Sequence, residues 1–298
     1  MKNQYVGDIG DFGKYSMLRE FIKGGVKVGV NWYLTENDGS NDGKFTDYLS
    51  KDVMRRYCPK VFDALAGIAN KNDKSVSDIE NSDILPGAIF YSDILKPEGT
   101  PGNREQERNS WFQESLYELK DAELIFMDPD NGLLESDDAT KLGGEKYVLP
   151  SEVERYFVSG HNVVYYCHKG RRPYEQWEAH KSIMFNRIDD AKPAILTYHK
   201  GSQRSYIFLI HERDFVRYRK IIDWILNGWY KIFSEEYTTK GNSAGEPVGD
   251  ALVIQREDGR TYRIEKRADG NIQMTSSTEP NATRIVPVDM FLRDIGYR

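Results

Sequence analysis

The chain has 298 residues, of which 39% are hydrophobic, 30% charged and 12% aromatic, and its net charge is −6. This composition describes an ordered globular protein with one large domain, or one domain and an appendage. No apolar run is long enough to span a bilayer, the first residues lack the apolar core of a signal peptide, and Cys58 and Cys167 lack metal-ligand spacing. We therefore expect a cytoplasmic protein with no membrane segment and no structural zinc site.

Helices and strands alternate through the first 235 residues, a pattern that predicts a largely parallel sheet covered by helices. The helices are recognised by apolar residues at helical spacing and the strands by short apolar runs. In chain order we first expect a helix at 11–22, a strand at 26–34, a polar glycine-bearing loop at 35–43 and mostly helix at 44–85. A strand at 88–95, a helix at 104–119 and a strand at 123–128 follow, and then a long polar loop. The last elements are a helix from Ser151, a strand at 161–168, a helix at 174–185, a hairpin of strands at 194–199 and 205–211, and a helix at 214–233.

The composition changes after this region. Residues 236–249 are rich in Gly, Ser, Thr and Pro, which indicates a linker. Beyond it, short strand-like segments are joined by Asp-Gly pairs, the residues that favour tight hairpin turns. The sequence therefore predicts a large domain at 1–235 and a small antiparallel β module at 250–298. Within that module Arg260, Arg263 and Arg267 alternate with apolar positions, so one face is expected to be basic.

The most informative motif directly follows the apolar run at 123–128, and reads Asp128-Pro129-Asp130-Asn131-Gly132. A short continuous apolar run predicts a strand buried on both faces, and a proline ends it because it cannot donate to a ladder. In open α/β folds ligands bind at this carboxyl edge of the sheet. The alternative is a strand that simply ends in turn residues, since Asp-Pro and Asn-Gly are common turn pairs.

Polar residues also follow the neighbouring strands of the predicted sheet. We expect five of them to converge with the first helix on one cleft at the carboxyl edge: Asp11, Asn37, Asp93, Asp128 and His168. Two carboxylates two positions apart at a buried strand end repel each other. At least one of Asp128 and Asp130 should therefore have a raised pKa, unless a cation or a donor lies between them.

The element order, a parallel sheet closed by an antiparallel hairpin, is similar to that of class I methyltransferases that use S-adenosylmethionine. The opening Val6-Gly-Asp-Ile-Gly-Asp-Phe-Gly-Lys-Tyr15 resembles the opening of the large-subunit ribosomal RNA adenine-N6 methyltransferases. In that family a strand and a polar glycine loop follow, as Trp32 to Gly39 do here. The resemblance covers roughly residues 5–233. It implies a Rossmann-like methyltransferase sheet, S-adenosylmethionine as cofactor, and methylation of an amino group in RNA or DNA.

The resemblance also implies roles for particular residues. Asp128-Pro129-Asp130-Asn131 stands where the family has Asp-Pro-Pro-Tyr, so Asp128 would accept a hydrogen from the target amine, with help from the Pro129 carbonyl. His168, at the end of the next strand, would join this catalytic group. Because Asn131 replaces the stacking aromatic residue, a nearby tyrosine would stack on the extruded base: Tyr165, Tyr166 or Tyr174. The cofactor would be bound by Asp11, Lys14, Tyr15, Asn37, Asp38, Gly39 and Asp93.

Two alternatives remain open. Asp128 and Asp130, with Asp38, Asp42 or Asp93, could hold Mg²⁺ or Mn²⁺ for phosphodiester hydrolysis, assisted by His168 and Lys169. The chain could instead be a non-catalytic scaffold of methyltransferase fold. In either case, aromatic residues of the helix at 214–233 indicate core packing or a homo-oligomer interface, and the β module is a second candidate for such an interface.

Overall fold

The computed structural model describes residues 1–39, 45–229, 231–236, 252–255, 261–266, 271–276 and 283–287. The chain divides into two compact units, Met1–Glu236 and Tyr237–Arg298. None of the helices in the described ranges is long and apolar enough to span a membrane.

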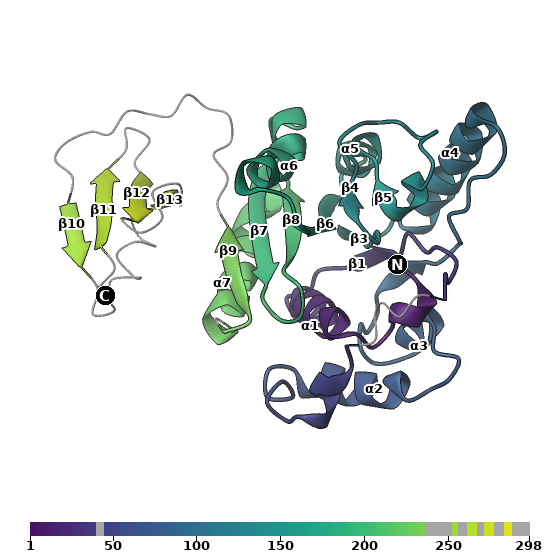
Figure 1. Cartoon of the computed structure of the whole chain (residues 1–298), viewed down its shortest axis with the longest axis horizontal. Coiled ribbons are helices and arrows are strands. Elements are labelled where there is room, and N and C mark those ends of the chain that lie inside the picture. The colour runs from purple at the N-terminus through teal and green to yellow at the C-terminus, as the bar shows by residue number, and fades with distance from the viewer. Residues whose placement is uncertain are drawn as a thin grey trace. The chain divides into compact units, whose positions relative to one another are not determined.

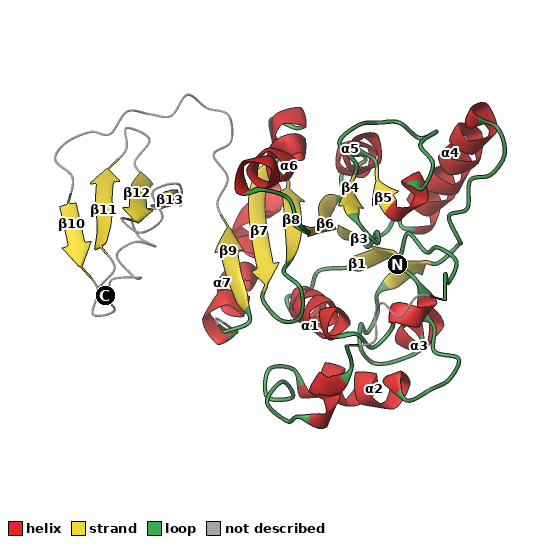
Figure 2. Ribbon diagram, in the orientation of Figure 1, coloured by secondary structure: helices red, strands yellow, loops and turns green. Residues whose placement is uncertain are grey.

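The first unit is built on a seven-stranded mixed sheet with the order β2-β1-β3-β6-β8-β7-β9 (Figures 1 and 2). The first four of these strands are parallel, β8 is antiparallel to both β6 and β7, and β9 is antiparallel to β7. The predicted α/β class, with a mostly parallel sheet and an antiparallel hairpin, is therefore confirmed. The strands are β1 (Val28–Asn31), β2 (Ile89–Tyr91), β3 (Leu124–Met127), β6 (Asn162–His168), β7 (Lys192–Tyr198), β8 (Arg204–Ile210) and β9 (Phe233–Glu236).

Helices cover both faces of this sheet, and each face has its own hydrophobic core. Strand β3 contributes to both cores, since Leu124 and Phe126 belong to one and Ile125 and Met127 to the other. This is the doubly buried strand that its continuous apolar run predicts. The first core includes residues of α1 (Ile9–Lys23), α2 (Pro59–Ala69), α3 (Val76–Glu80) and α7 (Glu212–Gly228), and the second residues of α4 (Pro101–Glu118), α5 (Pro150–Val158) and α6 (Tyr174–Arg187).

Three parts of the first unit differ from the sequence prediction. The segment 44–85 was expected to be mostly helical, but in its described part only Asp47–Ser50, Pro59–Ala69 and Val76–Glu80 are helical. The helix expected at 214–233 ends at Gly228, and Phe233–Glu236 forms β9 at the edge of the sheet. Burial alternates along these four residues, a strand pattern too short to recognise beside a helix. The expected linker at 236–249 thus begins on the last residue of β9, and its remainder, 237–249, lies outside the described residues. The long loop after β3 contains β4 (Gly132–Leu133), the 3₁₀ turn η3 (Gly144–Lys146) and β5 (Tyr147–Val148).

The second unit contains a four-stranded antiparallel sheet in the order β10-β11-β12-β13. The strands expected near 251–256, 261–265 and 271–274 correspond to β10 (Leu252–Gln255), β11 (Thr261–Lys266) and β12 (Asn271–Ser276), and β13 (Thr283–Pro287) is additional. The Asp-Gly pairs, Arg260 and Arg267 lie outside the described residues, as does the side chain of Arg263.

Candidate active site at the carboxyl edge of the sheet

A cavity of about 450 Å³ lies at the carboxyl ends of β3 and β6. Its walls come from segments far apart in the sequence: the first residues of the chain, the start of α1, the turn after β3, and the start of β8. Side chains of both charges and several tyrosines face it. The cavity is therefore placed where open α/β sheets bind ligands.

Lys14 supplies a buried positive charge at one wall. Its Nζ lies 2.6 Å from Oδ2 of Asp128 and 2.8 Å from Oδ1 of Asp11. The same ammonium lies 4.8 Å from the ring centre of Tyr15 and 5.7 Å from that of Trp32. Two carboxylates and two aromatic faces therefore surround this cation, which compensates for its removal from water.

Asp128 keeps one carboxylate oxygen available. Lys14 binds Oδ2, and no hydrogen bond to the other oxygen, Oδ1, occurs among the described residues. Burial raises the pKa of Asp128, and the nearby positive charges of Lys14 and of the Met1 α-amino group oppose this shift. A held carboxylate with a free oxygen can accept a hydrogen from a bound ligand.

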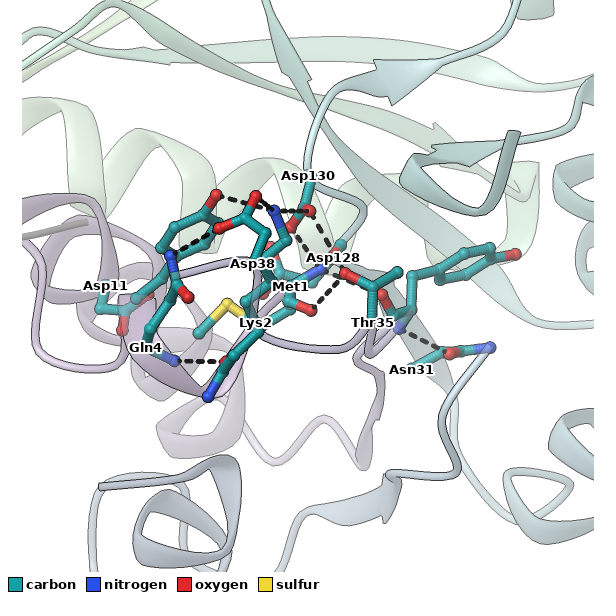
Figure 3. Close-up of polar contacts among 12 residues, drawn as sticks. Met1, Lys2, Gln4, Asp11, Asn31, Thr35, Asp38, Asp128 and Asp130 are labelled. Atoms are coloured by element: carbon teal, nitrogen blue, oxygen red, sulfur yellow. Dashed lines mark hydrogen bonds and ion pairs between the residues drawn. The ribbon is translucent and has the colours of Figure 1, made fainter. Parts of the chain in front are cut away.

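Asp130 pairs with the Met1 α-amino group, whereas Asp128 pairs with Lys14; Figure 3 shows the contacts of Asp130. The Met1 α-amino nitrogen lies 2.8 Å from Oδ1 of Asp130, and it also donates to the carbonyls of Asp128 and Tyr33 at 3.0 Å each. Burial acts to raise the pKa of Asp130, but the Met1 amino group and Lys2 lower it below its ordinary value. The expected repulsion between the two carboxylates is thus relieved: each has its own cation, and only Asp128 has a raised pKa.

The first residues of the chain also hold the loop that follows β1. Lys2 Nζ lies 2.6 Å from Oδ2 of Asp38, and the Gln4 side chain donates to Oδ1 of Asp38 at 3.1 Å. The backbone N–H of Gln4 donates to Oδ1 of Asn37 at 3.1 Å (Figure 3 shows Gln4 and Asp38). These bonds fix Asp38 at the mouth of the cavity.

The opposite wall is formed by β6, β8 and the start of α1. Arg204 pairs with Asp8 at 3.0 Å, and His168 is the strand partner of Arg204. Gly10 allows the guanidinium to lie against the helix, because a Cβ there would approach Arg204 Nε to 2.5 Å. The pKa of His168 is lowered by burial and by the charges of Arg204 and Arg172, so the imidazole is neutral near pH 7.

Most of the predicted site residues are brought together here. The cavity is lined by Asp11, Lys14, Asp38, Asp128, Pro129, Asp130, Asn131 and His168. Tyr15 lies behind Lys14 in the core, and Asn37 and Gly39 belong to the loop at the mouth but do not line the cavity.

Of the five residues expected to converge, Asp11, Asp128 and His168 line the cavity, whereas Asn37 and Asp93 do not. Asp93 is exposed, and its carbonyl accepts a hydrogen bond from Trp111. The physical reason is the position of β2 at the edge of the sheet, because the end of β1 separates it from β3. Sequence alone could not assign that edge position.

Several residues of the cavity were not predicted. The unpredicted residues include Lys2, Tyr5, Asp8, Lys146, Arg204 and Tyr206. Asp8 had a local signal, as the N-cap residue of α1. The others had none, because their place depends on how the N-terminal segment, the loop that contains η3 and the hairpin strand meet the end of the sheet.

No three His, Cys, Asp or Glu side chains in the described ranges are arranged to hold a metal ion. The cavity carboxylates instead contact ammonium and guanidinium groups. No family model matches the chain, and no curated protein is significantly similar to it.

Proposed function

We propose that this protein is an S-adenosylmethionine-dependent methyltransferase that modifies an amino group in a nucleic acid. The observation that carries the proposal is Asp128, which stands at the carboxyl end of the doubly buried strand with one oxygen held by Lys14 and the other available. The sheet supports it, because an antiparallel strand inserted beside β6 is typical of class I methyltransferases.

The side chains of the cavity fit the chemistry of the cofactor. S-adenosylmethionine carries an ammonium group, a carboxylate, ribose hydroxyls and an adenine ring. Arg204 and Lys146 would bind the carboxylate, Asp8 and Asp38 the ammonium and the hydroxyls, and Tyr206 the ring. When bound, the cofactor would supply an electrophilic methyl group. The volume of about 450 Å³ lies within the range of small-molecule sites.

The chain's own residues would prepare the attacking amine. The free Oδ1 of Asp128 would accept one of its hydrogens, and Lys14 would keep this carboxylate oriented. Of the tyrosines considered for base stacking, Tyr166 lines the cavity, whereas Tyr165 is buried in the second core and the side chain of Tyr174 is not described. Tyr166 is therefore the stacking candidate.

Basic residues close in sequence to cavity-lining residues of β6 and the turn before β8 support a nucleic acid as the substrate. Lys169, Arg171 and Arg172 directly follow β6, and Lys200 lies in the turn before β8. Within the described part of the chain none of these four, nor Lys146, forms an ion pair with an acidic side chain. Unpaired cations beside an aromatic-lined cavity match a phosphate backbone that presents one base.

The metal-dependent alternative is less well supported by this geometry. A divalent ion between Asp128 and Asp130 would have to displace Lys14 and the Met1 amino group, which already compensate the two carboxylates. It stays a separate hypothesis with its own measurement, which is titration with Mg²⁺ and Mn²⁺.

The decisive experiment measures S-adenosylmethionine binding by calorimetry and transfer of a radiolabelled methyl group to RNA and to single-stranded DNA. We expect binding without added metal, and Asp128→Ala, which removes the acceptor oxygen, should lower transfer by about 10²- to 10⁴-fold, the usual contribution of a general base. Asp128→Ala should leave folding and cofactor affinity largely unchanged. Absence of cofactor binding to the wild-type protein, or transfer by Asp128→Ala at the wild-type rate, would refute the proposal.

A further inference from the structure

A buried ion pair joins α4 and α5, two of the helices that pack in the second core. Arg108 of α4 and Glu152 of α5 are 1% and 3% exposed, and Arg108 Nε lies 2.7 Å from Glu152 Oε1. Arg108 Nη2 also donates to Glu152 Oε2 at 3.0 Å. Buried pairs of this kind cost desolvation energy, so they are better explained by what they position than by net stability.

Glu152 holds the turn at Tyr33, whose carbonyl accepts a hydrogen bond from the cavity-lining Met1. The Tyr33 hydroxyl donates to Glu152 Oε2 at 3.0 Å, and the Tyr33 backbone N–H donates to Asn31 Oδ1 at 3.1 Å. Tyr33 has a φ of 45° and is the only non-glycine residue with positive φ in the described ranges. An aromatic residue takes this conformation only where its surroundings fix it. In this conformation the Tyr33 carbonyl accepts a hydrogen bond from the Met1 amino group, which also donates to the Asp128 carbonyl.

Arg108 holds a second segment, the η3 turn, which carries the cavity-lining Lys146. Its Nη1 donates to the Gly144 carbonyl at 2.8 Å and its Nη2 to the Tyr147 carbonyl at 2.7 Å. These two carbonyls flank Lys146, whose side chain lines the cavity. The Lys146 carbonyl in turn accepts the backbone N–H of Asn131 at 2.9 Å. The Arg108 guanidinium thus holds the η3 turn, and the η3 turn in turn bonds to the segment that carries Asp130 and Asn131.

We propose that Arg108 and Glu152 are positioning residues that fix two turns next to the active-site cavity: the Tyr33 turn, which binds the amino group of the cavity-lining Met1, and the η3 turn, which carries the cavity-lining Lys146. Neither side chain lines the cavity, and both act through other residues. The use of this geometry for cofactor binding rests on the proposed function, whereas the positioning itself does not.

The test combines two variants with a matched control. Arg108→Lys keeps a positive charge for Glu152 but cannot donate to both flanking carbonyls, and Tyr33→Phe removes only the hydroxyl bond to Glu152. The control is Arg19→Lys, because Arg19 is also buried and donates to two backbone carbonyls, those of Asp83 and Ile84, but does not line or brace the cavity.

Hydrogen exchange followed by mass spectrometry reads out the positioning directly. Arg108→Lys should speed exchange in peptides covering 129–134 and 143–149, and Tyr33→Phe should speed it around 31–35 only. Arg19→Lys should change neither region. Wild-type exchange at both 129–134 and 143–149 in Arg108→Lys would overturn the proposal.

Affinity for S-adenosylhomocysteine gives the second readout, at a temperature where every variant is folded. Arg108→Lys should weaken binding about tenfold, the lower end of what supporting residues cost at ordered sites, and Arg19→Lys should not weaken it. An equal loss in both variants would mean a general stability effect and would count against positioning. If the wild-type protein does not bind this probe, the proposed function fails. The exchange data alone then decide whether Arg108 and Glu152 are positioning residues.

Discussion

At the scale of single residues, the site is organised around paired charges. Lys14 lies between Asp11 and Asp128, and all three side chains are almost completely buried. A buried carboxylate without a cation would be costly, so the position of Asp128 depends on Lys14. This pairing explains how acidic residues can gather at a strand end without a metal ion between them.

Replacing Lys14 should therefore lower the stability of the folded protein. Lys14→Met leaves Asp11 and Asp128 buried without their cation, and we expect the free energy of unfolding at pH 7 to fall by about 3–5 kcal/mol. Urea denaturation measures this change. The control is Lys23→Met on the same helix, whose ammonium is exposed and pairs with Glu20, so its effect should stay within about 0.5 kcal/mol. Equal effects of the two substitutions would contradict the role given to Lys14.

Asp130 should make stability depend on pH in a definite direction. Its pKa is lowered in the folded protein, so in the unfolded chain, with a pKa of about 3.9, it binds protons more readily. Its contribution is therefore present above about pH 3.9 and is lost as the pH falls through the folded value. The difference in unfolding free energy between wild type and Asp130→Asn should be largest near neutral pH and should shrink in acid. A difference that grows in acid would show that the sign is wrong.

Methyl transfer should also be lost in acid, but at a higher pH and through Asp128. Its pKa is raised by burial, and the proposed acceptor must be ionised, so the rate should increase with pH through a value above the ordinary aspartate range. A rate profile from acid to neutral pH measures this limb. Asp130→Asn should retain this increase of the rate with pH, since Asp130 is not the acceptor. If the increase disappeared in that variant, Asp130 and not Asp128 would be the titrating group.

At the scale of elements, helix α1 carries the site because two of its glycines allow close approach. Gly10 lies against Arg204, and Gly13 lies against the ring of Tyr198 on β7, where a Cβ would approach Cε2 to 2.7 Å. The Tyr198 hydroxyl donates to the Ile9 carbonyl at 3.1 Å. The start of α1, which carries Asp11 and Lys14 and is preceded by Asp8, therefore packs closely against the end of the sheet.

A pair of glycine substitutions tests this packing. Gly13→Ala should destabilise the protein by about 1–3 kcal/mol, because the buried Tyr198 ring must move. Gly67→Ala in α2 meets nothing within 4 Å, so it should stabilise by about 0.5–1 kcal/mol through the better helix propensity of alanine. Thermal or urea unfolding distinguishes the two signs. Stabilisation by both substitutions would mean that α1 does not pack closely on β7.

At the scale of the whole molecule, the boundary between the two units follows β9. Its last residue, Glu236, bonds to Lys181 of α6 and to Thr197 and Ser205 of the sheet. Phe233 and the preceding Ile232 are buried in the first core. A cut near Phe233, where the predicted helix was expected to end, would remove most of an edge strand.

Two truncated chains test this boundary. A chain ending at Glu236 should fold and keep the unfolding temperature of the first unit. A chain ending at Trp229 should lose about 1.5–3 kcal/mol for each of the buried side chains of Ile232 and Phe233, and also leave Lys181 without Glu236. Calorimetry of both chains provides the comparison. Equal stability would show that β9 is not part of the domain. Comparing the longer chain with the full protein for RNA affinity then tests whether the β module contributes to substrate binding, as its expected basic face predicts.

The sequence determined the α/β class, the doubly buried β3 and the polar turn after it, because these depend on local periodicity and on proline and glycine chemistry. Of the five residues predicted to converge, Asp11, Asp128 and His168 do line one cavity, since strand ends and the start of the first helix meet at one edge. Only the tertiary structure decided that Asp93 lies outside, because the order of strands is set by long-range pairing. The same holds for Arg204, Lys2 and the Arg108–Glu152 pair, whose partners lie far away in the chain and leave no local pattern.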